Sequence, residues 1–144
     1  MVRSLAYRTF QLRFKLAVAA EVAGFEAGGK ILSELDRKDG FVHLSDRTSP
    51  PKVASLFFAG AKDLHILEVD ATKLAHPVLW IVGVMGDEPP GTDTLAASET
   101  TVHYLMSDGC VHVYGQAGVS MSSVVRKAHV PLGTDGKHVF PAWL

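Results

Sequence analysis

Two short segments of this chain each place a histidine beside a second polar side chain in an otherwise apolar run. In Phe41–Ser45, His43 and Ser45 are two residues apart, and in Cys110–Tyr114, His112 alternates with valines. Because alternate side chains of a strand share a face, each segment would present polar residues on one side and apolar residues on the other. An imidazole exchanges protons near neutral pH and a hydroxyl hydrogen-bonds ligands, so the two strands together predict a polar pocket.

Each histidine also has a structural interpretation, which the sequence leaves open. His43 could be a core histidine with both ring nitrogens bonded to backbone groups, and His112 could form a hydrogen-bonded pair with Tyr114 that fixes its strand. Gly40 favours a pocket, because a residue without a side chain lets a ligand approach the backbone. A nucleophile–base pair of Ser45 with either histidine lacks an obvious third partner, so no hydrolase triad is predicted.

The histidines and the cysteine predict no metal centre. His43, His103 and His112 could offer imidazoles to zinc, but they come from separate segments without the close spacing of a known zinc motif. We therefore expect no metal ligands, and we expect Cys110 to be a small buried hydrophobe. The other histidines, expected to be structural or solvated, are His65, His76, His129 and His138.

The composition indicates one globular domain over residues 1–144. With 144 residues, 47% of them hydrophobic and 20% charged, the chain is long enough for a core and too apolar to be disordered. Its net charge of −1 lacks the basic excess of a nucleic-acid-binding protein, so no nucleic-acid partner is expected. The single cysteine excludes an internal disulfide and suits a reducing compartment.

The first residues resemble a targeting peptide in one respect, because basic side chains and no acid precede Glu21. However, Phe14, Val18 and Val22 recur at helical spacing, as in a helix that docks on a sheet. We therefore expect a cytoplasmic protein. The apolar run Val78–Met85 is too short for a membrane span, so no membrane partner is expected.

The polar strands need a scaffold, and the chain predicts an α+β fold in which strands outnumber helices. Branched residues indicate strands, helical spacing indicates helices, and clusters of Gly, Pro and Asp indicate loops. We expect strands over 5–10, 41–45, 64–69, 78–84, 100–106 and 110–114, with 64–69 and 78–84 central in the sheet; helices over 13–25 and about 50–59; a loop or turn over 30–38; an exposed loop over 86–94; a hairpin turn at 107–109; a strand or short helix plus strand over 122–130; and a surface tail over 133–144.

Four segments carry a resemblance to a known family. They are Asp39-Gly40-Phe41-Val42-His43-Leu44-Ser45, Ala59–Leu64 with Leu67–Asp70, Leu79-Trp80, and Val111–Gly115. In this order and at similar spacing, over nearly the whole chain, they resemble the mostly bacterial family catalogued as domain of unknown function nine hundred and fifty-two. Members of that family look like small relatives of the ADP-ribosyltransferase fold: split, strongly bent β-sheets with one or two packed helices, and a cleft that binds NAD in the catalytic branches. The resemblance implies the fold more firmly than a function.

The resemblance also implies a site for a ligand similar to NAD or ADP-ribose in that cleft. Arg8 on the first strand would face a phosphate, because its planar donors suit that group. His43 and Ser45 would hydrogen-bond a ribose, and an aromatic ring would stack on or cap the ligand. The implied ligand-binding residues are Arg8, His43, Ser45, Trp80, His112 and Tyr114.

Two departures from the family pattern bear on catalysis. The family usually follows its tryptophan with a glutamate, whereas Ile81 follows here, and it usually has proline where this chain has Val111. Without that acid, a reaction through an oxocarbenium-like state lacks a carboxylate near the ribose. Acids from the following loop that could substitute are Asp87, Glu88 and Glu99.

These inferences leave three functions open. The first is binding of a nucleotide or similar small ligand, with no assigned activity and no assigned catalytic residue. The second is a non-catalytic interaction module whose histidines fix the sheet. The third is a transferase or hydrolase that acts on an NAD-like substrate, which needs a carboxylate in the cleft. The oligomeric state also stays open.

Overall fold

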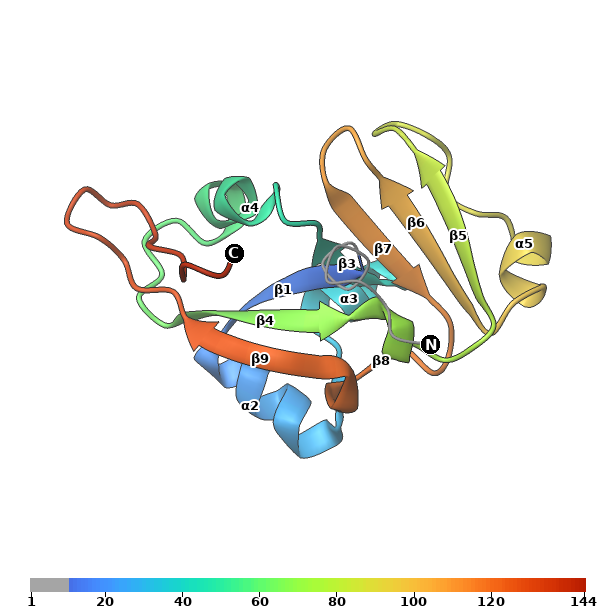
Figure 1. Cartoon of the computed structure of the whole chain (residues 1–144), viewed down its shortest axis with the longest axis horizontal. Coiled ribbons are helices and arrows are strands. Elements are labelled where there is room, and N and C mark those ends of the chain that lie inside the picture. Colours follow the sequence, from blue (N-terminus) through green and yellow to red (C-terminus); the bar gives the residue numbers. More distant parts are fainter. Residues whose placement is uncertain (1–10) are drawn as a thin grey trace.

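A bent, mixed sheet organises the protein, and a computed structural model describes residues 11–144 of it (Figure 1). The spatial order of its seven strands is β5 (Val78–Gly83), β6 (Thr100–Leu105), β7 (Cys110–Tyr114), β3 (Val42–Ser45), β1 (Leu12–Val18), β4 (Leu64–Asp70) and β9 (Val124–His129). β5 and β6 run parallel, and the other neighbours run antiparallel. The expected α+β class is confirmed.

A small second sheet and a few helices complete the described residues. The second sheet pairs β2 (Lys30–Ile31) with β8 (Val119–Ser120). No helix within residues 11–144 is long and apolar enough to cross a membrane. The helical elements are α2 (Ala19–Gly28), α3 (Glu34–Asp39), α4 (Pro50–Phe57) and α5 (Thr92–Ala96), with the 3-10 turns η1 (Ala71–Lys73) and η2 (Met121–Ser123).

The main sheet divides between β1 and β3. β1 pairs with β4 along its whole length, but a single register pair, Phe14 with Ser45, joins β1 to β3. In Figure 1, β5, β6 and β7 accordingly run steeply across the direction of β1, β4 and β9. The two half-sheets, β5-β6-β7-β3 and β1-β4-β9, therefore separate at the polar strand β3.

The first described strand corrects the sequence prediction. The sequence predicts a helix over 13–25, but β1 occupies the start of that segment and α2 the rest. Phe14 and Ala17 belong to apolar clusters on opposite faces of the sheet, as strand alternation requires. Pairing of β1 with β4 and β3 therefore overrides the helical spacing of its apolar residues. The strand predicted over 5–10 lies outside the described residues.

The segment predicted as a loop over 30–38 instead holds β2 and most of α3. Ser33 Oγ accepts a hydrogen bond from the backbone N–H of Asp36, and the Asp36 carboxylate accepts one from the backbone N–H of Ser33. This reciprocal arrangement is a capping box, which starts a helix by satisfying its free N–H groups. The sequence signal is present, with aspartate in the place of the usual glutamate or glutamine.

The other predicted elements lie close to the observed ones. β3, α4, β4 and the antiparallel hairpin of β6 and β7 occupy the expected segments, and η2 with β9 fills most of 122–130. α5 begins inside the predicted exposed loop. β5 is an edge strand and not the predicted central one, with Val82 60% exposed. An apolar run does not distinguish a strand with two neighbours from a strand with one.

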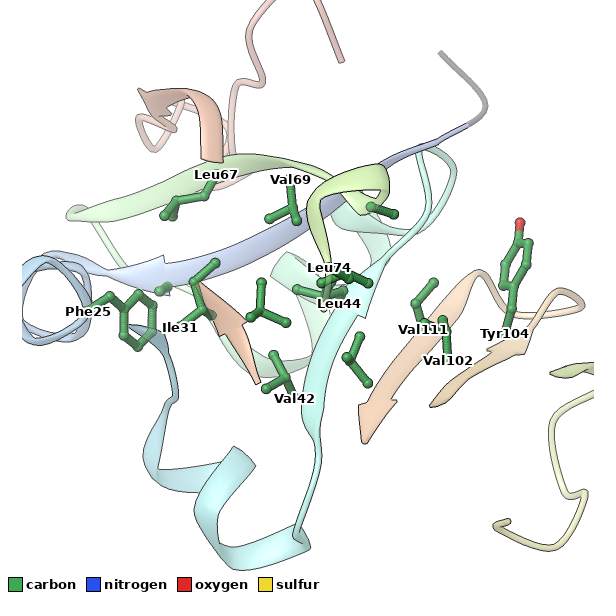
Figure 2. Close-up of a cluster of buried hydrophobic side chains, with 14 of the residues drawn as sticks. Phe25, Ile31, Val42, Leu44, Leu67, Val69, Leu74, Val102, Tyr104 and Val111 are labelled. Atoms are coloured by element: carbon green, nitrogen blue, oxygen red, sulfur yellow. The ribbon is translucent and has the colours of Figure 1, made fainter. Parts of the chain in front are cut away.

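Two apolar clusters pack on opposite faces of the sheet. The larger one groups Phe25 of α2 with Leu44 and Leu67, which come from the two half-sheets (Figure 2). The smaller one joins β1 and β4 to α4 and the C-terminal tail, where Phe14 stacks on Trp143 with ring centroids 6.3 Å apart. The larger cluster therefore holds the half-sheets together, although one register pair joins their backbones.

Candidate functional site

Three histidines form a row across three neighbouring strands. The antiparallel register places His43 of β3 opposite His112 of β7, and His112 opposite His103 of β6. The ring centroids of His43 and His112 are 5.5 Å apart, and those of His112 and His103 are 6.5 Å apart. The structure thus brings together the two histidines on which the predicted pocket depends, and it adds a third.

His43 is held between two carboxylates. Its Nδ1 lies 2.7 Å from Asp36 Oδ1, and its Nε2 lies 2.9 Å from Asp39 Oδ2. Because carboxylate oxygens accept hydrogen bonds, a ring N–H is the donor in each of these contacts. The ring nitrogens of His43 therefore have carboxylate side chains as partners, and not the backbone groups expected of a core histidine. The side chain is 27% exposed, so it still reaches the surface.

Asp36 is the buried centre of this arrangement. Lys15 Nζ, from β1, donates to both carboxylate oxygens of Asp36 and to the backbone oxygen of His43, with distances from 2.9 to 3.0 Å. Burial alone would raise the pKa of Asp36, but the hydrogen bond from His43 and the charge of Lys15 hold that pKa well below its ordinary value. Burial also lowers the pKa of Lys15, against the charge of Asp36. The network spans the gap where β1 and β3 separate.

His112 is the chemically available member of the row. Burial, followed by the positive charges of His43 and His103, lowers the pKa of His112 to about 4. The ring is therefore neutral at pH 7, and within residues 11–144 no hydrogen bond occupies its nitrogens. A neutral imidazole keeps one nitrogen lone pair, so His112 can accept a proton or a hydrogen bond from a ligand.

An aromatic cluster around Phe41 borders the histidine pair. The centroid of the Phe41 ring lies 4.5 Å from that of His43, 4.2 Å from that of His112 and 5.1 Å from that of Tyr114. Burial, reinforced by the charge of Asp39, raises the pKa of the Tyr114 hydroxyl, which therefore keeps its proton at pH 7. Phe41 thus joins three of the predicted ligand-binding residues in one cluster.

A groove of about 300 Å³ adjoins this cluster at Phe41 and Asp36. The cationic side chains of Lys30 and Arg37 line it, together with the backbone that follows β7. In that backbone Gly115 has a φ of 133°, and a Cβ there would lie 2.5 Å from the backbone oxygen of the residue before β6. Only glycine fits this position without strain. The groove therefore combines positive charge, an aromatic ring and open backbone.

The remaining predicted residues lie elsewhere. Trp80 packs against the larger apolar cluster, on the face of the sheet opposite the histidine row, with its ring centroid 5.1 Å from the guanidinium carbon of Arg13. Ser45 is buried where the half-sheets meet, opposite Cys110 in the register. Arg8 falls outside the described residues.

A second polar cluster, on the Trp80 face, has no counterpart in the sequence analysis. Tyr104 Oη donates to Asp46 Oδ2 at 2.6 Å, and the guanidinium carbon of Arg13 lies 4.9 Å from the centroid of the Tyr104 ring. Burial, together with the hydrogen bond to Asp46, raises the pKa of Tyr104 to about 12. Tyr104 lies in β6, Arg13 lies in β1 and Asp46 follows β3. Because only the fold brings these strands together, no spacing in the sequence predicts the cluster.

One of the three loop acids, Asp87, has its side chain beside the end of β5. Its Oδ2 accepts a hydrogen bond from the backbone N–H of Val84 at 2.9 Å. A Cβ added to Gly83 would lie 2.3 Å from that oxygen and 3.6 Å from His103 Nε2, so the glycine leaves space for the carboxylate beside the ring. Asp87 therefore lies at the end of the histidine row opposite to Asp36.

The histidine row is not a preassembled metal centre. Among residues 11–144, no group of three or more histidine, cysteine, aspartate or glutamate side chains is arranged to hold a metal ion. Both ring nitrogens of His43 are already engaged by carboxylates.

Comparisons with known proteins agree with this architecture. A family model described as "Protein of unknown function (DUF952)" matches residues 17–127. A crystal structure of protein CC0527 from Caulobacter crescentus is 23% identical, with a TM-score of 0.59, and the match covers 88% of this chain and 92% of that one. A crystal structure of a double mutant of CC0527 is 26% identical with a TM-score of 0.60, over 88% and 92% of the two chains. A solution NMR structure of CC0527 is 27% identical with a TM-score of 0.53, over 88% and 90%. No curated protein matches this chain.

Proposed function

The chain belongs to DUF952, a family of proteins of unknown function, and we propose that it binds a small phosphate-bearing ligand of the nucleotide kind in the groove beside His43 and His112. The observation that carries this proposal is the pair of His43 and His112 rings in contact with Phe41, which also lines the groove that holds the cations Lys30 and Arg37. ADP-ribose and NAD are the model ligands. As part of the proposal, the sheet that splits between β1 and β3 is of the ADP-ribosyltransferase-like kind.

The lining of the groove supports an anionic ligand with a flat ring. Lys30 Nζ donates to the backbone oxygen of Gln116 at 3.2 Å, and an ammonium group has two further protons for a ligand. Arg37 lines the same groove, and its planar guanidinium matches phosphate oxygens in pairs. The ring of Phe41 offers a stacking surface. A volume of about 300 Å³ is at the lower end for small-molecule sites, so the groove would enclose one nucleotide or half of a dinucleotide.

His43 and His112 would have different roles. Both N–H groups of His43 already bond Asp36 and Asp39, so this ring would act through its charge and not as a direct donor. That charge helps to keep His112 neutral, because it contributes to the lowered pKa of His112. The free nitrogen of His112 would then accept a hydrogen bond from a ligand hydroxyl, such as that of a ribose.

A transferase or hydrolase is a second candidate, and one observation favours it. Ile81, which follows the tryptophan, lies opposite His103 in the register of β5 and β6. The carboxylate of Asp87 lies beside the same histidine, so it could supply the negative charge that Ile81 lacks. If neither ligand binding nor turnover is found, the interaction module becomes the preferred function.

An NMR titration tests the binding proposal. Isotope-labelled protein would receive ADP-ribose, NAD, AMP or inorganic phosphate, and we expect amide shifts centred on Phe41, Arg37 and Gly115 with the nucleotides. His112→Gln and Arg37→Ala should each weaken binding about tenfold or more, since each removes one hydrogen-bond partner of a polar or charged group.

The control for this titration is His138→Gln. His138 Nε2 bonds the backbone oxygen of Ala61 at 2.7 Å, and this histidine, unlike His112, makes no ring contact with the groove residue Phe41. Its replacement should leave nucleotide binding unchanged. Shifts that are absent at millimolar nucleotide, or that ignore His112→Gln and Arg37→Ala, would refute the proposal. An assay for nicotinamide release from NAD, repeated with Asp87→Asn, decides on turnover.

A further inference from the structure

We propose that His65 and His129 form an open site for a divalent transition-metal ion of the zinc or copper class, in a second groove between α2 and the outer edge of the sheet. This site uses none of the residues of the histidine row. Its existence is independent of the nucleotide-binding proposal.

The two histidines are direct neighbours on antiparallel strands. The register places His65 of β4 opposite His129 of the edge strand β9. Their ring centroids are 5.3 Å apart, and the ring planes are inclined by 45°. Two imidazoles that share a tetrahedral ion, with metal–nitrogen distances of about 2.0–2.1 Å, have ring centres roughly 5 Å apart. The observed separation therefore already suits a shared ion.

The hydrogen bonds of the two rings leave one lone pair on each. His65 Nδ1 lies 2.9 Å from the backbone oxygen of Asp63, and His129 Nε2 lies 2.7 Å from the backbone oxygen of Lys62. A carbonyl oxygen only accepts, so these two nitrogens carry the protons, and in the neutral rings His65 Nε2 and His129 Nδ1 are free to coordinate. Metal-binding histidines show this same pattern, because a backbone oxygen that accepts from the second nitrogen orients the ring.

The groove around the rings has room for an ion with its water ligands. Its volume is about 370 Å³, and Glu26 of α2 and Lys127 of β9 line it together with both histidines. Glu26 forms an ion pair with Lys127, so the carboxylate lends negative charge to the groove without being a third ligand in this arrangement. With two protein nitrogens, the ion completes its coordination with water. Binding is therefore exchangeable, unlike that of a closed structural zinc site with four protein ligands.

The histidine row is the rival location for an added ion. There, both nitrogens of His43 are engaged by carboxylates, and burial with neighbouring positive charge lowers the pKa of His112. The same positive charge that disfavours a proton on His112 disfavours a metal cation. Among the described residues that line the His65–His129 groove, Lys127 is the one lysine or arginine, and it is ion-paired with Glu26.

The test uses the full, tag-free chain and two readouts. Calorimetric titration with Zn²⁺ should give one equivalent, and added Cu²⁺ should broaden the NMR signals of residues around His65 and His129 first. His65→Gln and His129→Gln should each weaken Zn²⁺ binding about tenfold or more, because each removes one of two ligands. Binding should also weaken on acidification, since metal ligands must be deprotonated.

Two controls locate the site. His138→Gln removes another histidine that donates to a backbone oxygen, and His112→Gln removes the free ring of the histidine row. Both variants should bind Zn²⁺ like the unmodified chain, and amide spectra of all four variants report whether the fold is retained. The proposal is overturned if no ion binds at millimolar concentration, if His65→Gln and His129→Gln bind normally, or if His112→Gln abolishes binding.

Discussion

Lys15 Nζ lies 3.0 Å from the backbone oxygen of His43, across the gap where β1 and β3 no longer share a ladder. A side chain of one half-sheet therefore hydrogen-bonds the backbone of the other, in the place of a missing backbone pair. The same ammonium group pairs with Asp36, which in turn holds the His43 ring. The position of that ring, and of the proposed ligand site, thus depends on a lysine in a different half-sheet.

Lys15→Met should destabilise the protein by about 3 kcal/mol, because the buried carboxylate of Asp36 loses the ammonium group that pairs with it. Urea unfolding followed by circular dichroism measures this. The double variant Lys15→Met/Asp36→Asn should recover part of the loss, since the unpaired charge is gone. The matched control Lys127→Met removes an exposed ion pair with Glu26 and should cost no more than about 1 kcal/mol. Equal losses in the two single variants would contradict the role of Lys15.

His112 should make the protein less stable as the pH falls from about 6.5 toward 4. The folded pKa of about 4 lies below the ordinary imidazole value of 6.5, so in this window the unfolded chain binds a proton that the folded chain does not. The stabilisation is fully present above this window and is lost on acidification through it. In His112→Gln, the midpoint of urea unfolding should change less with pH across this window than in the unmodified chain. A His112 ring that titrates near pH 6.5 by NMR would show that this explanation fails.

Asp36 should produce a second, lower acid transition. Its folded pKa lies below the ordinary value, so its stabilisation is present above about pH 4 and is lost as the pH falls further and the unfolded chain takes up the proton first. Asp36→Asn should be less stable at pH 7 and should depend less on pH below 4. Urea midpoints at pH 5, 4 and 3 compare the two proteins. Parallel curves for the variant and the unmodified chain would rule out this role.

Gly115→Ala should destabilise the protein by about 1–3 kcal/mol and distort the groove. At a φ of 133°, the added Cβ would lie 2.5 Å from the Glu99 backbone oxygen, so the turn must change. Gly24→Ala is the matched control, because Gly24 lies inside α2 with nothing within 4 Å of the added Cβ. That variant should gain about 0.5–1 kcal/mol through helix propensity. Thermal unfolding of both variants checks the opposite signs.

Tyr104→Phe should cost about 1.5–3 kcal/mol, because it removes a hydrogen bond to the Asp46 carboxylate. Tyr114→Phe, which removes a hydroxyl with no hydrogen bond inside residues 11–144, should cost much less. An absorbance titration to alkaline pH adds an independent readout, since the pKa of Tyr104 is about 12. If the absorbance change of Tyr104 occurs near pH 10, its bond to Asp46 does not persist in solution.

The predicted face of β3 and β7 follows from local pattern. His43 and His112 each alternate with buried valine or leucine, and strand alternation depends only on neighbouring residues. Their pairing is different, because the register between β3 and β7 joins residues far apart in the chain. Alternation therefore identifies the face of His43 and His112. His103 is grouped with them from sequence only as a third imidazole that could bind zinc, and its place in the row follows from the register of β6 with β7.

The sequence pattern does not mark Asp36 and Lys15 as site residues, for two physical reasons. The capping box that starts α3 is a weak local signal, because the third helical residue is an aspartate where glutamate or glutamine is usual. It also lies in a segment that the sequence predicts as a loop. The helical spacing around β1 conceals Lys15, whose strand forms because it has partners on both sides. Partners supplied by the fold, and not by neighbouring residues, decide the state of both segments.

β3 and β7 are neighbours in the sheet, but β4, β5 and β6 lie between them in the chain. During synthesis, one edge of β3 therefore stays without its partner until β7 (Cys110–Tyr114) has been made. Pairings between distant segments also form slowly, because the entropy of closing a long loop is lost before the contacts between the segments contribute any stabilisation. A chain interrupted before β7 would expose a bare strand edge, which invites pairing with other chains. The histidine row therefore cannot form before β7 has been synthesised. A product truncated before β7 is prone to aggregate and does not retain part of the site.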